Sequence, residues 1–224
     1  DALGDKLALN LDTYGTLEQI FVKRLDIKGV EENDIPPITL LSLDGTVLQP
    51  LKPSALNYSV RLNPMRLSAA DVRRYLPRVP MPNLSGLGTL ALERGTLQGT
   101  LQTLTANVRA ASAAGNVETD CKLSWHDTLR YEASLTTERL NLAAITQNSE
   151  LQSNLNTKIN LTGQGATLAA LIAKVHVEAS PSDIAGRSFD ELVLDANAHD
   201  GGVITISSLN VHWNKAADFL AEDN

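Results

Sequence analysis

The chain is poor in the residues on which several common classes of protein depend. Cys121 is its one cysteine among 224 residues, so no disulfide can form within it. Aromatic residues make up 4% of the sequence, and 26 Asp and Glu outnumber 19 Lys and Arg, which gives a formal charge of −7. This acidic balance disfavours nucleic acid as a partner, because binding to phosphates needs clustered basic residues. The longest uninterrupted apolar run, Leu168 to Ala173, is far shorter than the roughly 20 residues of a spanning helix.

Aliphatic residues are abundant instead. Hydrophobic residues make up 43% of the chain, and 36 of them are leucine, a composition that excludes intrinsic disorder. Over most of the sequence apolar residues alternate with polar or small ones, as where Ile159 and Leu161 flank Asn160. Turn signals such as Asp44-Gly45 and Asp200-Gly201-Gly202 separate the alternating segments. The sequence therefore predicts a mainly β fold of short antiparallel strands joined by tight turns.

Helices are predicted to be few and short. Ser68 to Leu76 begins with a serine N-cap and is stopped by Pro77, and Asn141 to Gln147 is a weaker candidate of the same kind. Leu168 to Ala173 also contains helix-forming residues, but a strand pattern follows it directly.

A module of about seventy residues occurs twice, a period typical of extended arrays. Leu56 to Leu62 aligns with Leu129 to Leu135 at an offset of 73 residues, and Arg66-Leu67 aligns with Arg139-Leu140 at the same offset. We predict a partial β-module at 1–55, repeat modules at 56–128 and 129–213, and a C-terminal tail at 214–224.

The sequence contains no pattern that indicates catalysis or metal binding. It lacks a Gly-x-Ser-x-Gly elbow and a phosphate-binding Gly-x-x-x-x-Gly-Lys loop. Gly86-x-Gly88 and Gly163-x-Gly165 are interpreted as hairpin turns rather than as parts of a dinucleotide site. The four histidines, His126, His176, His199 and His212, have no metal-ligand spacing. His176 and His212 lie at polar positions of strands and are expected to face solvent, whereas His126-Asp127 and His199-Asp200 are interpreted as turn dipeptides. We therefore expect a protein that is not an enzyme, without metal or cofactor.

The aliphatic positions allow two interpretations. They can form the core between two packed sheets, although such cores usually also contain aromatics, and this chain has three Phe, two Trp and four Tyr. They can alternatively form a surface that contacts acyl chains, since hydrocarbon burial is non-directional and contributes roughly 0.8 kcal/mol per CH₂. Composition alone does not favour either interpretation.

The order of motifs over about residues 56–213 resembles that of the AsmA-like proteins, and among them the TamB family. Tyr131 to Leu135 leads into Arg139-Leu140-Asn141-Leu142. Ile159 to Leu168 contains a Gly-Gln-Gly turn, and Leu192-Val193-Leu194-Asp195-Ala196 follows as a further strand. The resemblance implies an elongated antiparallel sheet, curled into one continuous groove with an aliphatic interior and one or two short helices.

The resemblance also implies a function. We expect a segment of a longer periplasmic protein, anchored in the inner membrane of a Gram-negative bacterium, that shields phospholipid acyl chains. Its expected role is phospholipid transport between inner and outer membrane and outer-membrane biogenesis, with an outer-membrane barrel protein as a partner through regions outside this sequence. The alternative is a structural or adhesive β-sandwich module of an extracellular bacterial protein.

Strand phase predicts which side chains would line such a groove. They are the apolar members of the clearest alternating segments: Leu90, Leu92, Ile159, Leu161, Val175, Val177, Leu192, Leu194, Ile204, Ile206, Leu209 and Val211.

Overall fold

The computed structural model describes residues 7–29, 38–68, 70, 85–165, 170–199 and 203–213. It confirms that the chain is mainly β, with antiparallel pairing throughout these ranges. The chain divides into two compact units, Asp1–Ala113 (unit 1) and Ala114–Asn224 (unit 2). In the described part, no helix has the length and the hydrophobicity of a membrane span.

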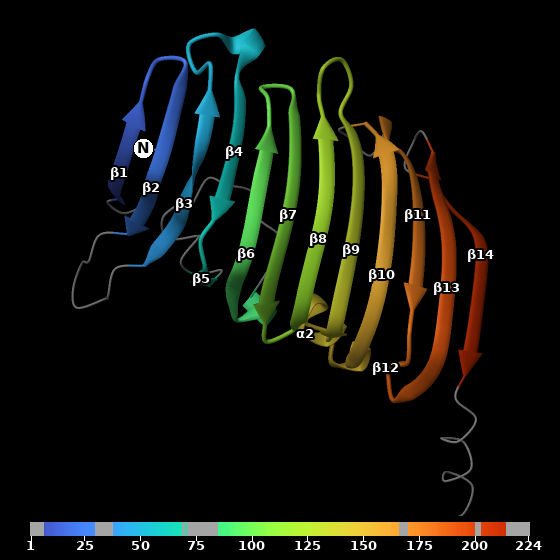
Figure 1. Cartoon of the computed structure of the whole chain (residues 1–224). Coiled ribbons are helices and arrows are strands. Elements are labelled where there is room, and N and C mark those ends of the chain that lie inside the picture. The colour runs from blue at the N-terminus through green and yellow to red at the C-terminus, as the bar shows by residue number, and fades with distance from the viewer. Residues whose placement is uncertain are drawn as a thin grey trace, which may run out of the picture. The chain divides into compact units, whose positions relative to one another are not determined.

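Unit 1 is a sheet with the strand order β1-β2-β3-β4-β6-β7 (Figure 1). The short strand β5 pairs with β6, as β4 does, along a different part of that strand. Single 3₁₀ turns occur at Pro53–Ala55 and Ser85–Leu87. The strands are β1 (Leu7–Gly15), β2 (Gln19–Gly29), β3 (Thr39–Leu48), β4 (Asn57–Leu62), β5 (Met65–Ser68), β6 (Thr89–Gly99) and β7 (Thr103–Ser112).

Unit 2 is a sheet with the order β8-β9-β10-β11-β13-β14, and the short β12 pairs with both β10 and β13. Helix α2 (Leu142–Thr146) and a 3₁₀ turn (Ser149–Leu151) join β9 to β10. The strands are β8 (Gly115–Ser124), β9 (Arg130–Leu140), β10 (Ser153–Gln164), β11 (Ile172–Ala179), β12 (Ser182–Ile184), β13 (Arg187–His199) and β14 (Val203–Trp213).

Helix α2 confirms the prediction made for Asn141 to Gln147. The Asn141 side chain accepts a hydrogen bond from the Ala143 backbone N–H at 3.0 Å, and Gln147 ends the helix with a left-handed φ of 58°. The predicted helix from Ser68 to Leu76 lies outside the described residues, apart from Ser68 and Ala70. Of the third candidate segment, Ile172 and Ala173 belong to β11, so strand pairing prevails over helix propensity there.

The two predicted repeats contain equivalent strand pairs. Tyr58 on β4 lies opposite Gly99 on β6, and Tyr131 on β9 lies opposite Gly163 on β10. A Cβ atom placed on Gly99 would lie 2.9 Å from the Tyr58 hydroxyl oxygen, and one on Gly163 would lie 2.7 Å from that of Tyr131. Each tyrosine thus occupies the space that a side chain on its glycine would fill. The exact module bounds remain a prediction.

Neither sheet has a conventional core in the described part of the chain. In unit 2, every pair of strands in substantial contact is a hydrogen-bonded pair, so no second layer of strands packs on this sheet among those residues. Among the described residues, the buried apolar side chains are small or isolated: Met65, Ala106, Ala114, Ala173, Ala179, Phe189 and Ala198. A β-sandwich would instead bury rows of large aliphatic side chains between two sheets.

Candidate functional site, an uncovered aliphatic face

Apolar side chains of unit 2 lie in rows that run across the strands. In one row, Leu161 on β10 lies opposite Ala133 on β9 and Val175 on β11. In the next row, Ile159 lies opposite Leu135 and Val177 on the same two strands. Residues directly opposite in an antiparallel sheet project from the same face, so the strand register places both rows on one side.

The rows continue across β13 and β14. Val177 lies opposite Leu194, which lies opposite Leu209, and the other pairs follow the same register. We call this surface the unit 2 aliphatic face. Its members on β10 to β14 are Ile159, Leu161, Gly163, Ala173, Val175, Val177, Ala179, Leu192, Leu194, Ala196, Ala198, Ile204, Ile206, Leu209 and Val211.

The structure thus brings ten of the twelve predicted lining residues onto one face. The other two, Leu90 and Leu92 on β6, lie in unit 1 opposite Leu67 and Met65 of β5. A bulge between Leu92 and Arg94 shifts the register of β6. As a result Leu92 and Leu97 project from the same side of the sheet, although their positions differ by an odd number of residues. That any of the twelve contacts lipid remains a prediction.

Exposure increases toward the last strand of unit 2. The predicted lining residues on β10, β11 and β13 are half-buried by neighbours on both sides, and three alanines of the face, Ala173, Ala179 and Ala198, are buried. On β14, which has a described neighbour on one side only, Ile204 is 71% exposed, and Ile206 and Leu209 are also exposed. Exposed aliphatic side chains grouped on one face indicate a binding surface more strongly than scattered ones do.

The opposite face of unit 2 is polar. Asn160, His176, Asp195 and Ser208 form a cross-strand row on this face. The Nδ1 atom of His176 lies 2.7 Å from Oδ1 of Asp195, and Ser208 donates a hydrogen bond to Oδ2 of Asp195 at 2.7 Å. These contacts link β11, β13 and β14 through side chains as well as through the backbone.

The residues Ser208, Asp195 and His176 do not form a catalytic triad. In a triad the histidine receives the proton of the serine hydroxyl, whereas here the Ser208 hydroxyl donates to the carboxylate. The second ring nitrogen of His176, Nε2, faces Oε1 of Glu178 at 3.2 Å instead of a nucleophile. The arrangement lacks an activated hydroxyl and is that of a surface ion-pair network.

Both carboxylates act on the imidazole of His176. Hydrogen bonding to Asp195 and then to Glu178 raises the pKa of His176 above 6.5, and the hydrogen bond from His176 lowers the pKa of Asp195, with a further contribution from Ser208. The imidazolium can donate to both carboxylates at once, whereas neutral imidazole can donate to only one.

The pH dependence of stability follows from these directions. The folded-state pKa of His176 is raised, so its contribution is complete below about pH 6.5 and is lost as the pH rises through the folded-state value. We expect an NMR titration of the His176 ring to give a midpoint above 6.5. We also expect the change in unfolding free energy between pH 6 and 8 to be smaller in His176→Gln. A midpoint at or below 6.5, with an unchanged pH profile in the variant, would contradict this.

The remaining candidate residues do not gather into a site. His126, His199 and His212 lie apart and are exposed, and His212 faces Glu191 across the β13–β14 pair. Within the described ranges, no group of three or more His, Cys, Asp or Glu side chains is placed to bind a metal. Cys121 is half-buried on β8, opposite Ala133.

A buried carboxylate in unit 1 gave no signal in the sequence. Asp26 on β2 is 1% exposed, and its Oδ1 accepts a hydrogen bond from the Ser42 hydroxyl on β3 at 2.8 Å. Arg24 Nε lies 2.6 Å from Oδ2, an ion-pair contact without hydrogen-bond geometry to that atom. In the sequence, Asp26 alternates with apolar neighbours as a solvent-facing residue would. Its partner Ser42 is 16 positions away, so no local pattern indicates that the carboxylate is buried.

Comparison with known proteins yields no relative. No protein-family model, no curated protein and no solved structure matches this chain.

Proposed function

We propose that the aliphatic face of the sheet shields lipid acyl chains. The observation that carries this proposal is the arrangement of unit 2, where aliphatic rows cross four or more strands and no second layer of strands covers them among the described residues. Four strand spacings of about 4.8 Å, from β9 to β14, make the face roughly 19 Å wide. A groove formed by curling of this sheet belongs to the same proposal.

The chemistry of the face suits acyl chains. Each buried CH₂ contributes roughly 0.8 kcal/mol, so a chain that buries about ten of them gains several kcal/mol even after its ordering is counted. The central members of the face are Leu, Ile, Val and Ala, which offer no hydrogen bond that would fix one pose. The face therefore suits binding of hydrocarbon without strong selection of its position along the strands.

A β-sandwich module is less well supported. In a sandwich the inner face of each sheet is covered by the other sheet. The polar opposite face of unit 2 carries the charged side chains Lys158, Lys174 and Glu178, which suits contact with water. The aliphatic face thus remains the one that needs a covering ligand.

The cellular part of the proposal depends on the sequence resemblance to the AsmA-like and TamB families. It places the chain in the periplasm, as a segment of a protein anchored in the inner membrane. There it would serve phospholipid transport between the membranes and outer-membrane biogenesis, without catalysis and with an outer-membrane barrel protein as partner. The order of strand, predicted short helix and Gly-containing turn in the sequences of the two repeats supports this assignment.

Native mass spectrometry of the purified chain tests the proposal. We expect mass additions that match phospholipids, and solvent extraction should identify them. A chain refolded without lipid and then incubated with phospholipid vesicles should regain the same additions. Absence of lipid in both preparations, from a chain with an intact β circular-dichroism spectrum, would count against the proposal.

A further inference from the structure

One edge of unit 2 exposes large apolar side chains at each of its hairpin connections. Strands β8, β10 and β13 run parallel to one another and end at this edge, where connections lead to β9, β11 and β14. Trp125 follows β8 and is 42% exposed, Ile172 opens β11 and is 42% exposed, and Val203 opens β14 and is 58% exposed. We call these three side chains, each beside a connection between strands, the hairpin edge.

The opposite edge of unit 2 provides an internal comparison. Its described connections are 141–152, which contains α2, and 180–186, which contains β12. Their large aliphatic residues are all half-buried: Leu142, Ile145, Leu151 and Ile184. Among the described connections of unit 2, exposed large apolar side chains are therefore found at the hairpin edge, although Trp213, which ends β14 at the opposite edge, is also 49% exposed.

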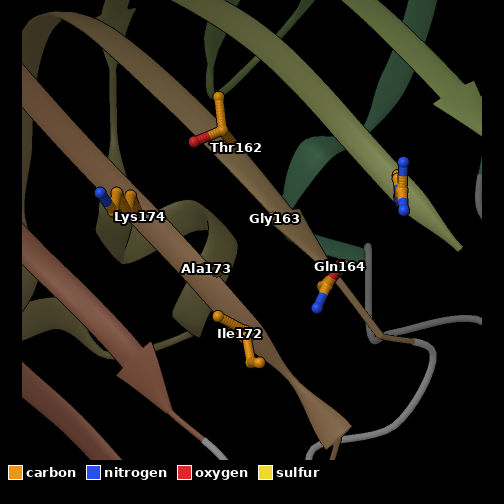
Figure 2. Close-up of a pocket in the computed structure, with 7 residues that line it drawn as sticks. Thr162, Gly163, Gln164, Ile172, Ala173 and Lys174 are labelled. Atoms are coloured by element: carbon orange, nitrogen blue, oxygen red, sulfur yellow. The ribbon is translucent and has the colours of Figure 1, made fainter. Parts of the chain in front are cut away.

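A hollow of about 250 Å³ lies beside the hairpin edge. It is formed by the ends of β9, β10 and β11, and Figure 2 shows Gln164, Ile172 and Lys174 around it on neighbouring strands. Among the described residues that line it, Arg130 and Lys174 are charged and none is a carboxylate. Within the described part of the chain, neither of these two cations forms an ion pair. The hollow therefore suits an anion such as a phosphate group.

Unit 1, taken by itself, shows a related feature. Its β1–β2, β3–β4 and β6–β7 connections share one edge and expose Leu17, Leu51 and Leu101. Two of these connections are Gly-Thr-Leu turns with the same closure. The Thr16 N–H donates to the Gln19 carbonyl at 2.8 Å, and the Thr100 N–H donates to the Thr103 carbonyl at 3.0 Å. The threonine backbone makes the hydrogen bond that holds each turn together, so the turn does not require a leucine side chain at its tip.

We propose that the hairpin edge of unit 2 docks on the surface of a phospholipid bilayer. Arg130 and Lys174 bind lipid phosphates, while Trp125, Ile172 and Val203 enter the interfacial layer. Charge complementarity favours this occupant, because a bilayer surface presents phosphates directly above hydrocarbon, and the edge presents a cationic hollow beside apolar tips. Tryptophan is also enriched at such interfaces. The separated tips suit a fluid surface, which closes around each side chain without a matching pocket.

This inference stands apart from the proposed function. Docking uses the edge of the sheet, whereas acyl-chain shielding uses the aliphatic face. A chain can dock without carrying lipid or carry lipid without docking. Vesicle binding measures the first, and native mass spectrometry of co-purified lipid measures the second.

Fluorescence of Trp125 tests the docking. The chain contains two tryptophans, and Trp213→Phe removes the second while keeping an aromatic ring against Phe189, whose ring centroid lies 6.3 Å away. The probes are vesicles of phosphatidylcholine and phosphatidylglycerol with brominated acyl chains. We expect the Trp125 emission to shift to shorter wavelength and to be quenched by the bromines. Vesicle binding without quenching of Trp125, or no binding at all, would overturn the proposal.

A pair of double variants tests the cationic hollow. Arg130→Gln with Lys174→Gln should weaken vesicle binding about tenfold, whereas Lys158→Gln with Arg187→Gln removes the same charge away from the hairpin edge and should change it less than twofold. Equal weakening in both pairs would show unspecific charge attraction and overturn the proposal. Binding of inorganic phosphate without vesicle binding would do the same. Native mass spectrometry of the first pair reads the aliphatic face separately, because co-purified lipid should persist there.

Discussion

Replacing Leu161 by aspartate is expected to reduce bound phospholipid about a hundredfold. Leu161 lies in the middle of the unit 2 aliphatic face, between Ala133 and Val175. A carboxylate among hydrocarbon costs roughly 2.5–3.5 kcal/mol, and each 1.4 kcal/mol corresponds to a factor of ten. The measurement is the ratio of lipid-bound to lipid-free chain in native mass spectra at equal protein concentration.

The neighbouring position provides the matched control. Thr162 is exposed on the polar face, opposite Lys174, so Thr162→Asp introduces the same charge one residue away and on the other side of the sheet. We expect it to retain lipid. Equal loss of lipid in both variants would show that a negative charge on either side of β10 removes lipid, which would contradict binding at the aliphatic face.

A second pair covers the case in which Leu161→Asp fails to fold. Ile206 is an exposed member of the face on β14, and Thr205 beside it is exposed on the opposite side. Ile206→Asp should fold and lose lipid, whereas Thr205→Asp should fold and keep it. Folded variants that both retain lipid would contradict binding at this end of the face.

Asp26→Ala is expected to cost unit 1 about 2–3 kcal/mol of unfolding free energy. The substitution removes the hydrogen bond from Ser42 to a charged acceptor, a type of bond worth about 1.5–3 kcal/mol, and the ion-pair contact with Arg24. The Arg24 side chain is 59% exposed and keeps its hydration, so the pair itself adds little. The measurement is the midpoint of chemical denaturation.

Asp44→Ala provides the control within the same sheet. Asp44 also pairs with an arginine, Arg61 at 2.8 Å, but it is 23% exposed and Arg61 is 69% exposed. Pairs of this kind contribute about 0–1 kcal/mol. Similar losses in the two variants would contradict the account of Asp26.

The pH dependence of Asp26 has a defined sign. The hydrogen bond from Ser42 lowers its pKa below 3.8 against the effect of burial, and Arg24 lowers it further. Its contribution to stability is therefore present above about pH 3.8 and is lost as the pH falls through the folded-state pKa. The difference between the Asp26→Ala variant and the unsubstituted chain should shrink in that acidic range.

Strand phase predicted the shared face because each strand alternates locally and antiparallel register preserves the alternation between neighbours. The segment from Ile204 to Val211 shows how far this extends. Its apolar residues change from even to odd positions after Ile206, and the register of β13 and β14 shifts at that point, where Ser208 and Ile206 lie opposite consecutive residues. A bulge restores the phase, so all four apolar residues project from one side. The change of phase is visible in the sequence, and the bulge in β14 explains it.

Features that depend on long-range pairing were not predictable in the same way. Asp26 and Ser42 meet only because β2 and β3 pair in one particular register. Arg130 and Lys174 line one hollow because the start of β9, the end of β10 and the start of β11 lie at the same edge of the sheet. The exposed tips, such as Leu17, are indistinguishable from core leucines in a chain with so many of them.

Photo-crosslinking at single positions tests the central claim most directly. A benzophenone side chain is placed in turn at Leu161 and Leu194 on the unit 2 aliphatic face, and at Lys158 and Asn197 on the polar face, and each purified chain is irradiated with its co-purified lipid. The account predicts lipid adducts at the first two positions and none above background at the other two. Equal adducts on both faces, or adducts only at Lys158 and Asn197, would contradict it.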